Sequence, residues 1–310
     1  MRRLAALLLA VLIVFAIAAW FLLKPRIVVA QDAAALAPGR GDAARGAIVF
    51  AAGGCASCHA TPVPEGKPDL ARLGGGLRLK TAFGTFVVPN ISPDPKDGIG
   101  AWSDADIANA LLAGTSPDGR HYYPAFPYTT YAHMRLADVA DLTAYLRTLP
   151  KVPGRQPPHD LAFPYDQRWG LGLWKARYLD RSPIEPVAGQ SESWNRGRYL
   201  VEALGHCAEC HSPRDAFGGI VPSRRFAGGP DPEGKGFIPN ITQAPNALGK
   251  WSTDDIVEVL TSGNTPDFDN VSGSMADVVR NTSQLPATDR EAMAAYLKSL
   301  PAIASPPKPK

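Results

Sequence analysis

The most apolar stretch of this 310-residue chain lies at its start, where no charged residue occurs from Leu4 to Leu23. Arg2 and Arg3 precede this stretch, and Lys24 and Arg26 follow it. Twenty helical residues that rise ~1.5 Å each match the ~30 Å hydrocarbon core of a membrane. The pattern therefore predicts a transmembrane helix.

A cleaved signal peptide is the alternative interpretation of this segment. Signal peptides have a shorter apolar region, typically ~7–15 residues, although Val28-Val29-Ala30 resembles a small-residue cleavage site. The pair Arg2-Arg3 is an ordinary basic flank, because the rest of a twin-arginine signal is absent. An uncleaved anchor over residues 1–26 is favoured. The basic residues on both sides of the span do not decide its orientation.

The rest of the chain repeats its apolar and polar pattern at an offset of about 150 residues, which predicts two tandem domains. Each copy predicts a first helix, a long loop, a helix with a Ser N-cap and an acidic first turn, and a closing helix that stops at Leu-Pro. The matching segments are Arg45-Gly46 and Arg196-Gly197, Pro89–Ser92 and Pro239–Thr242, Trp102–Ile107 and Trp251–Ile256, and Leu142–Leu146 and Met293–Leu297.

The repeat places the domains at residues 38–152 and 189–303, with a connector at 153–188. Lys151 to Pro158 is rich in proline and glycine, and an aromatic-rich stretch from Phe163 to Trp174 follows it. We expect this stretch to be a helical connector that packs one domain against the other. Residues 304–310, rich in proline and lysine, are predicted to be disordered.

Composition indicates small domains with long irregular connections, since the chain has 30 prolines and 29 glycines. The net charge is +3, from 32 basic and 29 acidic residues. Without the four basic residues beside the apolar segment, 28 basic and 29 acidic residues remain, a balance of −1. No basic patch of the kind that binds nucleic acid is present, so we expect protein partners and a membrane instead.

All four cysteines lie in two copies of one pentapeptide, Cys55-Ala56-Ser57-Cys58-His59 and Cys207-Ala208-Glu209-Cys210-His211. Cys-x-x-Cys-His is the covalent attachment signature of c-type haem. The two thiols add to the porphyrin vinyl groups, and the adjacent histidine becomes the proximal iron ligand. The sequence therefore predicts two c-type haems, held by Cys55, Cys58 and His59 and by Cys207, Cys210 and His211.

A redox dithiol or a four-cysteine zinc ribbon would use the same cysteine spacing. A ribbon separates its two pairs by ~15–20 residues, whereas almost half of this chain lies between them. A dithiol needs no histidine directly after it. Both alternatives are therefore disfavoured.

The second axial ligand decides the haem chemistry, because methionine favours electron transfer and an open site favours peroxide or oxygen chemistry. Met134, just before the first closing helix, and Met275, in a predicted glycine-containing loop, are the candidates. They do not align on the repeat, so His121 and His133 remain alternatives in the first domain.

The other candidate ligands are assigned elsewhere. Met1 is the start of the chain, and the spacing of Met293 on the closing helix predicts a core position. His206 lies too close to its own motif to be a ligand, and both it and His159 are interpreted as surface or structural residues.

The plan of each half, one haem motif followed by helices and a ligand loop, is that of a class I cytochrome c domain. The chain further resembles the multihaem cytochrome c subunits of membrane-bound bacterial dehydrogenases, the partners of quinoprotein alcohol dehydrogenase and of flavin-dependent gluconate and related sugar dehydrogenases. The resemblance covers the chain from about Gly46 to Pro301. It is carried by Phe83–Asp94, Gly98–Ser103, Tyr123–Tyr128 with Met134, Phe163–Trp174 and Met275–Val279.

The repeat and the apolar segment predict an all-α fold of two tandem class I cytochrome c domains behind an N-terminal transmembrane helix. The resemblance implies that Met134 and Met275 are the sixth ligands to the irons of His59 and His211. Two features depart from the family. Its members commonly carry three haem motifs and often anchor through their C-terminal end, whereas this chain has two motifs and an N-terminal apolar segment.

Together these features predict an electron-transfer protein and not an enzyme, because no residue resembles a catalytic base or an activated nucleophile. Haem attachment of this type occurs outside the bacterial inner membrane, so the anchored body is expected in the periplasm. It would take electrons from a periplasmic dehydrogenase and pass them to ubiquinone or to another respiratory cytochrome or oxidase. The alternatives are a dihaem peroxidase or thiosulfate-oxidising enzyme, and the electron-entry subunit of a haem-copper oxidase.

Overall fold

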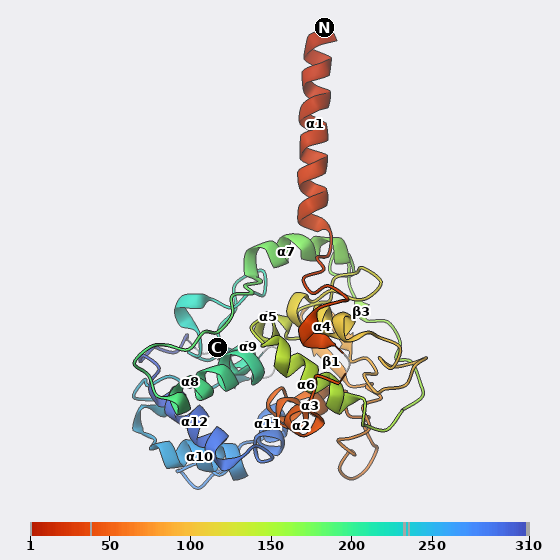
Figure 1. The fold of residues 1–310 in the computed structure, drawn as a ribbon. Coiled ribbons are helices and arrows are strands. Elements are labelled where there is room, and N and C mark those ends of the chain that lie inside the picture. The colour runs from red at the N-terminus through yellow and green to blue at the C-terminus, as the bar shows by residue number, and fades with distance from the viewer. Residues whose placement is uncertain (1, 38, 232–233, 235, 308–310) are drawn as a thin grey trace.

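The computed structural model describes residues 2–37, 39–231, 234 and 236–307. A body of two mostly helical domains carries one long helix, α1, that projects away from it (Figure 1). The all-α class, the two domains and the N-terminal apolar helix predicted from the sequence are therefore confirmed.

The elements of the N-terminal region and first domain are α1 (Arg2–Leu23), η1 (Ala34–Leu36), α2 (Ala43–Ala52), α3 (Cys55–His59), β1 (Arg78–Thr81), β2 (Gly84–Val87), α4 (Asp104–Ala113), α5 (Tyr128–Tyr131) and α6 (Leu136–Leu146). The connector contains β3 (Asp160–Leu161), η2 (Arg168–Gly170) and α7 (Leu171–Tyr178). The second domain contains α8 (Glu192–Tyr199), η3 (Leu200–Leu204), α9 (Cys207–Cys210), η4 (Pro222–Arg224), β4 (Gly229–Pro230), β5 (Phe237–Ile238), η5 (Leu248–Lys250), α10 (Thr253–Ser262), α11 (Ser274–Thr282) and α12 (Ala287–Lys298).

Helix α1 exposes its apolar side chains along its whole length. Its segment Arg3–Leu23 has a mean hydropathy of 3.0 and is not buried by the rest of the chain. Within the described residues it is the one helix long and apolar enough to cross a membrane, by length and composition. Water is a poor solvent for so long an apolar surface.

The segment directly after α1 belongs to the folded body. The backbone N–H groups of Val28 and Val29 donate to Asn109 Oδ1 on α4, over 2.7 and 3.0 Å. Asn109 Nδ2 donates in return to the Val29 carbonyl. The side chains of Val29 and Leu36 join the hydrophobic core of the first domain. The chain is therefore fixed to the body within a few residues of the end of α1.

The first and last helices of each domain cross in close contact, and a glycine makes each crossing possible. A Cβ atom on Gly46 of α2 would lie 2.0 Å from the Asp141 carbonyl oxygen of α6. A Cβ on Gly197 of α8 would lie 1.8 Å from the Ala292 carbonyl oxygen of α12. Any larger residue would force the helices apart, since such distances are far below van der Waals contact. The repeated Arg-Gly pair in the sequence marks this crossing.

The same helix pairs are joined by an ion pair and an aromatic contact in each domain. In both cases an arginine of the first helix binds a buried aspartate of the last helix. The pairs are Arg45–Asp141 at 2.7 Å and Phe50–Tyr145 with ring centroids 5.2 Å apart in the first domain, and Arg196–Asp289 at 2.7 Å and Trp194–Tyr296 at 5.3 Å in the second. The two domains are therefore built on one plan.

The helices α4 and α10 begin and end where the sequence predicts. Ser103 and Ser252 each form a capping box with the aspartate three residues later. Gly114 and Gly263 end the helices in the left-handed conformation, with φ of 57° and 86°. A residue without a Cβ adopts this conformation at little cost.

The short strands are a feature that the sequence did not predict. Strands β1, β2 and β3 form an antiparallel sheet, with Arg78 opposite Val87 and Gly84 opposite Leu161. Strands β4 and β5 form a two-residue pair. Pairs of two to four residues are too short to leave a clear alternating pattern.

Within the tail predicted to be disordered, the Ser305 hydroxyl accepts a hydrogen bond from Asn240 Nδ2 over 3.1 Å. The contact ties Asn240 of the second domain to the segment that follows the closing helix. Residues 308–310 lie outside the described residues.

Helix α7 of the connector contacts both domains. Lys175 Nζ donates to the carbonyls of Ala113 and Gly114 at the end of α4 in the first domain. Trp174 Nε1 donates to the Phe217 carbonyl of the second domain, over 2.9 Å. The connector is thus a packed helix between the domains, as its aromatic content suggested.

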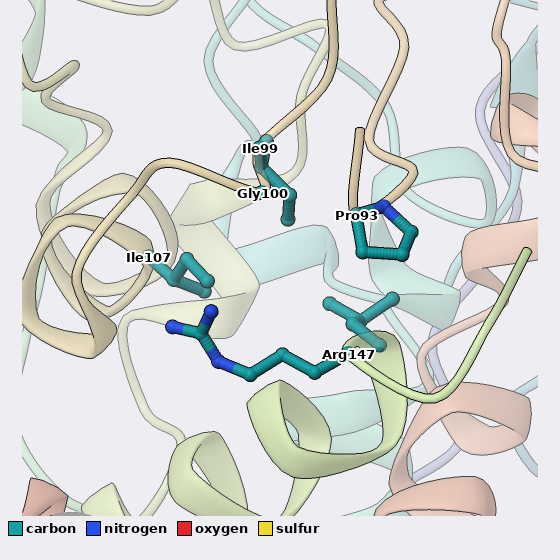
Figure 2. Close-up of a pocket in the computed structure, with 6 residues that line it drawn as sticks. Pro93, Ile99, Gly100, Ile107 and Arg147 are labelled. Atoms are coloured by element: carbon teal, nitrogen blue, oxygen red, sulfur yellow. The ribbon is translucent and has the colours of Figure 1, made fainter. Parts of the chain in front are cut away.

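The close-up in Figure 2 shows a small cavity in the first domain, and no residue of the cysteine motifs lines it. It lies between Pro93, Ile99 and Gly100 of the long loop, Ile107 of α4 and the end of α6 at Arg147. Its volume of about 10 Å³ is the space of about one water molecule. This cavity is a packing gap and not a ligand site.

Candidate haem-binding sites

The two haem motifs adopt the same local structure. Cys55 and Cys58 lie on α3, and Cys207 and Cys210 lie on α9. Residues three apart on a helix project from the same side, so the paired thiols are positioned for one flat cofactor. No disulfide joins the four cysteines, all of which lie in the described part of the chain.

The turn before each motif is left-handed. Gly54 precedes Cys55 with φ of 63°, and His206 precedes Cys207 with φ of 39°. A left-handed histidine is uncommon and marks a constrained position.

Each motif histidine donates through Nδ1 to a proline carbonyl. The distances are 2.9 Å from His59 to Pro89 O and 2.8 Å from His211 to Pro239 O. Because a carbonyl only accepts, Nδ1 carries the hydrogen and Nε2 keeps its lone pair for a metal. Desolvation lowers the pKa of His59 to about 4 and also lowers the pKa of His211. Both imidazoles are therefore neutral at neutral pH, the form that binds a metal.

Buried asparagines hold the two proline carbonyls in place. Asn90 Nδ2 donates to the carbonyls of Val152 and Gly154, over 2.7 and 3.0 Å, while its Oδ1 accepts from the Ser92 N–H. In the second domain Asn240 Nδ2 donates to Ile303 O over 2.7 Å. The repeated Pro-Asn pair thus ties the loop whose proline carbonyl bonds the motif histidine to the chain after the closing helix.

A glycine in each domain completes this support. The N–H groups of Gly75 and Gly228 donate to the backbone carbonyls of His59 and His211, over 2.9 and 2.8 Å. Both glycines have positive φ, and a Cβ on Gly75 would lie 2.4 Å from Pro89 O. The sequence analysis missed both. Their shared position between the haem motif and the Pro-Asn pair was the available signal.

Met134 is buried in the core of the first domain. Tyr131, three residues before it, donates its hydroxyl to the carbonyl of Gly53 over 2.6 Å. Gly53 in turn lies two residues before Cys55 of the haem motif. The segment that carries Met134 is therefore fastened beside the first motif.

Met275 occupies a different kind of position. The prediction that it lies in a loop is wrong, because Ser274–Thr282 is helical and Met275 lies in the first turn of α11. Gly273 directly before it has φ of 59°. In the first domain the corresponding helix, α5, is only four residues long. Met275 thus lies at the start of its helix and Met134 after the end of the corresponding one, so the two methionines do not align.

The other histidines considered in the sequence analysis form hydrogen bonds to the backbone. His121 Nε2 bonds Leu23 O at the end of α1 over 2.7 Å, and His133 Nδ1 bonds Ser182 O over 2.6 Å. His159 Nδ1 accepts from the Val87 N–H over 3.1 Å. Each of the three histidines thus bonds a backbone group distant in sequence.

The two haem motifs meet at the interface between the domains. A Cβ on Gly54 would lie 3.3 Å from His206 Nε2, and the ring of His206 packs edge-on against Tyr131, with centroids 5.9 Å apart. The residues directly before Cys55 and Cys207 are therefore neighbours. The interpretation of His206 as a structural residue agrees with this position.

The third residue of each motif binds the opposite domain. Ser57 Oγ accepts from Asn281 Nδ2 of α11 over 2.6 Å. Glu209 accepts from the hydroxyls of Thr129 and Thr130 of the first domain, over 2.6 and 3.0 Å. The contacts are reciprocal. Each haem motif is hydrogen-bonded to the other domain, at a segment that lies close in sequence to that domain's candidate methionine ligand.

Glu209 remains charged although it is buried. Burial alone would raise the pKa of its carboxyl, but Arg214 at 2.7 Å and the two threonine hydroxyls lower the pKa below its usual value. A carboxylate with these donors is satisfied.

The donor set and its support fit a c-type haem in each domain. Each site offers two thiols on one side of a helical turn and a neutral imidazole with Nε2 available. No group of three or more His, Cys, Asp or Glu side chains that could hold a metal ion occurs among the described residues, so the two cysteine pairs do not form a zinc ribbon.

Comparison with known proteins supports this assignment. The family model for cytochrome c matches residues 43–150 and 195–301. A protein named "Diheme cytochrome c-type" from Cereibacter sphaeroides is 55% identical over 304 residues, which cover 98% of this chain and all of that protein.

Two dehydrogenase subunits are also similar. The fructose dehydrogenase cytochrome subunit of Gluconobacter japonicus is 36% identical over 84% of this chain, and the cytochrome c subunit of the quinone alcohol dehydrogenase of Gluconobacter oxydans is 35% identical over 84%. The matches cover 53% and 55% of those two proteins, so this chain spans about half of their length. The resemblance to dehydrogenase cytochrome subunits is confirmed. The chain belongs to the cytochrome c family, as an electron-transfer protein with two cytochrome c domains and two c-type haems.

Proposed function

We propose that this protein is a membrane-anchored, periplasmic dihaem cytochrome c that passes single electrons from a periplasmic dehydrogenase to the respiratory chain. The observation that carries the relay is the reciprocal bracing of the two haem motifs, in which Ser57 and Glu209 each bind the opposite domain. A bound c-type haem supplies one-electron chemistry at each motif. The protein holds the two sites in one fixed arrangement.

The axial ligands follow from the same proposal. His59 and His211 are the proximal ligands, and the lone pair on each Nε2 supports this role. Met134 and Met275 are the sixth ligands. The buried position of Met134, three residues after the Tyr131 that bonds Gly53 O, supports methionine in the first domain.

The donor is proposed from the relatives, several of which are cytochrome subunits of dehydrogenases. The acceptor is ubiquinone or another respiratory cytochrome or oxidase.

The anchor is proposed to be α1, retained in the mature protein and spanning the inner membrane. A cut after Ala30 would detach Val28 and Val29, which bond Asn109, from the body. Cleavage there would remove a core side chain, Val29. This integration of the residues after α1 supports an uncleaved anchor.

The test begins with the purified full-length protein and a haem count by pyridine haemochrome. Two haems per chain, a methionine-to-iron charge-transfer band of two-haem intensity and reduction by a substrate-loaded dehydrogenase are expected. A haem that lacks the band and binds peroxide in the half-reduced protein would contradict the relay and favour a peroxidase. Co-purification with oxidase subunits in place of a dehydrogenase would assign it to a haem-copper oxidase.

The anchor is tested separately by the intact mass of the mature protein and by alkaline extraction of membranes. A mass that includes α1 and resistance to extraction are expected. A mature chain that begins after Ala30 would overturn the anchor but leave the relay intact.

A further inference from the structure

Helix α7 is fixed directly beside the end of α1. A Cβ on Gly172 would lie 2.5 Å from Leu22 O and 2.6 Å from Leu23 Cα, so the two backbones are in close contact. Figure 1 shows α7 lying crosswise to α1, along the side of the body from which α1 projects. The position of α7 relative to the end of the apolar segment is therefore set by backbone packing.

A second contact fixes the residues before α7 to the same point. Arg168 Nη1 donates to the His121 carbonyl over 2.7 Å, and the ring of His121 bonds the Leu23 carbonyl. The chain on both sides of Trp169 is thus held close to the last residue of α1.

The outward face of this segment is apolar and aromatic. Trp169 is 61% exposed and Leu173 is 52% exposed, and the spacing of four residues puts them on one side of a helical segment. Arg177, four residues further on, is exposed as well. On the opposite side Lys175 is buried against the first domain. Tryptophan, leucine and arginine on one exposed face are typical of a helix that lies in a membrane interface.

An open cleft of about 460 Å³ lies at the base of α1, next to the end of this face. Its apolar wall includes Phe21, Ile27 and Val28, and its charged residues are Lys24, Arg26 and Arg181. Among the described residues none of these three cations forms an ion pair. Lys24 Nζ lies over the ring of Trp20, 4.1 Å from its centroid.

Three unpaired cations beside an apolar wall, at the depth where a membrane span ends, match the headgroup and upper acyl chain of an anionic phospholipid. We propose that Trp169 and Leu173 insert into the headgroup layer and that the cleft binds the phosphate of an anionic phospholipid. This proposal rests on the proposed anchoring by α1. Its consequence is a soluble body held in one orientation to the membrane, so that the same haem edges always face the donor and the acceptor.

Spin labels on the full-length protein in lipid nanodiscs test the insertion. Since the native cysteines carry haem, Leu173→Cys provides the one free thiol for a nitroxide. Asp254→Cys on α10, at the opposite end of the body in Figure 1, is the matched control. The label at residue 173 is expected to collide more often with oxygen and less often with a water-soluble nickel complex than the label at residue 254. Equal accessibility at the two positions would overturn the insertion.

Lipid retention tests the cleft. Phosphatidylglycerol bound to the protein in nanodiscs that also contain phosphatidylcholine is counted by mass spectrometry. The Lys24→Gln/Arg26→Gln/Arg181→Gln variant is expected to lose its enrichment in phosphatidylglycerol, by about fivefold in affinity for each basic residue removed. The matched control neutralises Arg72, Arg78 and Lys80, exposed residues that do not line the cleft.

Enrichment that survives in the cleft variant, or that falls equally in the control, would overturn the lipid site. These outcomes are distinct from a failure of the proposed function. A protein without α1 would not enter the nanodisc at all, and a protein without electron transfer would still show the labelled depth and the bound lipid.

Discussion

Asn281 of the second domain donates its side-chain amide to Ser57 Oγ, inside the first haem motif, over 2.6 Å. The two residues are 224 positions apart in sequence. A second bond from the same Nδ2 to Asp277 O, over 2.9 Å, holds the amide in this orientation. The contact fixes a segment of one domain on the haem-attachment helix of the other.

Removal of this contact is expected to loosen the interface and to slow electron exchange between the haems. Asn281→Ala removes a hydrogen bond worth about 0.5–1.5 kcal/mol in the free energy of unfolding. The rate of haem-to-haem equilibration after pulsed reduction should fall, while the haem count stays at two. Asn246→Ala, at an exposed position, is the control. An unchanged rate in Asn281→Ala would show that the contact does not hold the haems in their relative position.

The Pro-Asn pairs are expected to tune each haem separately. Asn90→Ala removes the amide donor to the Val152 and Gly154 carbonyls and the acceptor of the buried Ser92 N–H, which costs about 1–3 kcal/mol of unfolding free energy. The released Pro89 carbonyl no longer orients His59, so the potential of the first haem should shift while that of the second stays constant. Asn240→Ala should give the reverse pattern.

Potentiometric titration of both variants checks this prediction. Each variant serves as the control of the other, because the two asparagines occupy equivalent places in the repeat. If one substitution moved both haem potentials equally, it would act on the whole protein and not through the loop that bonds the motif histidine.

The glycines at the helix crossings should tolerate no side chain. Gly46→Ala or Gly197→Ala places a methyl group 2.0 or 1.8 Å from a carbonyl oxygen of the facing helix. Overpacking of this kind costs about 1–3 kcal/mol, and a rigid backbone neighbour puts these two at the upper end. Denaturant unfolding measures the loss. Gly170→Ala is the control, since a Cβ there meets nothing within 4 Å, and a similar loss in it would contradict the packing argument.

The sequence predicted the parts of this molecule that depend on local chemistry. Ser103 marks the start of α4 and Gly114 marks its end. A hydroxyl cap and a residue that can take positive φ each act on the nearest turn of the helix, so both signals can be recognised locally in the sequence. The haem motifs and the repeat were recognisable for the same reason.

Features that depend on contacts distant in sequence were not predicted. Ser57 and Glu209 occupy variable positions of the motif, and nothing next to them indicates a partner in the other domain. The sequence around Met275 predicts a loop because Gly273 precedes it, whereas the structure places Met275 on a helix. In the structure, packing of α11 on α10 and on the first domain stabilises this helix, and tertiary contacts override weak local propensity.

Lys175 should make stability depend on pH in the alkaline range. Burial lowers the pKa of its ammonium from 10.5 to about 7. Between those values the unfolded chain binds more protons than the folded one, so the free energy of unfolding should rise with pH from about 7 to 10.5. Lys175→Met should flatten this rise, whereas Lys250→Met at an exposed position should not. An equal slope in wild type and Lys175→Met would show that the carbonyls of Ala113 and Gly114 keep the ammonium charged.

The methionine ligands predict a sharp spectroscopic result. Met134→Ala and Met275→Ala should each remove half of the methionine-to-iron charge-transfer band and lower the potential of one haem, because methionine ligation raises it. Met293→Leu, a volume-conserving change at a buried position on α12, should keep the full band and both potentials. The oxidised near-infrared spectrum and a redox titration of the three variants measure this. A full band in Met275→Ala would assign a different methionine to the second iron. A wild-type band of one-haem intensity that Met275→Ala leaves unchanged would mean that the second iron has a ligand other than methionine or an open site.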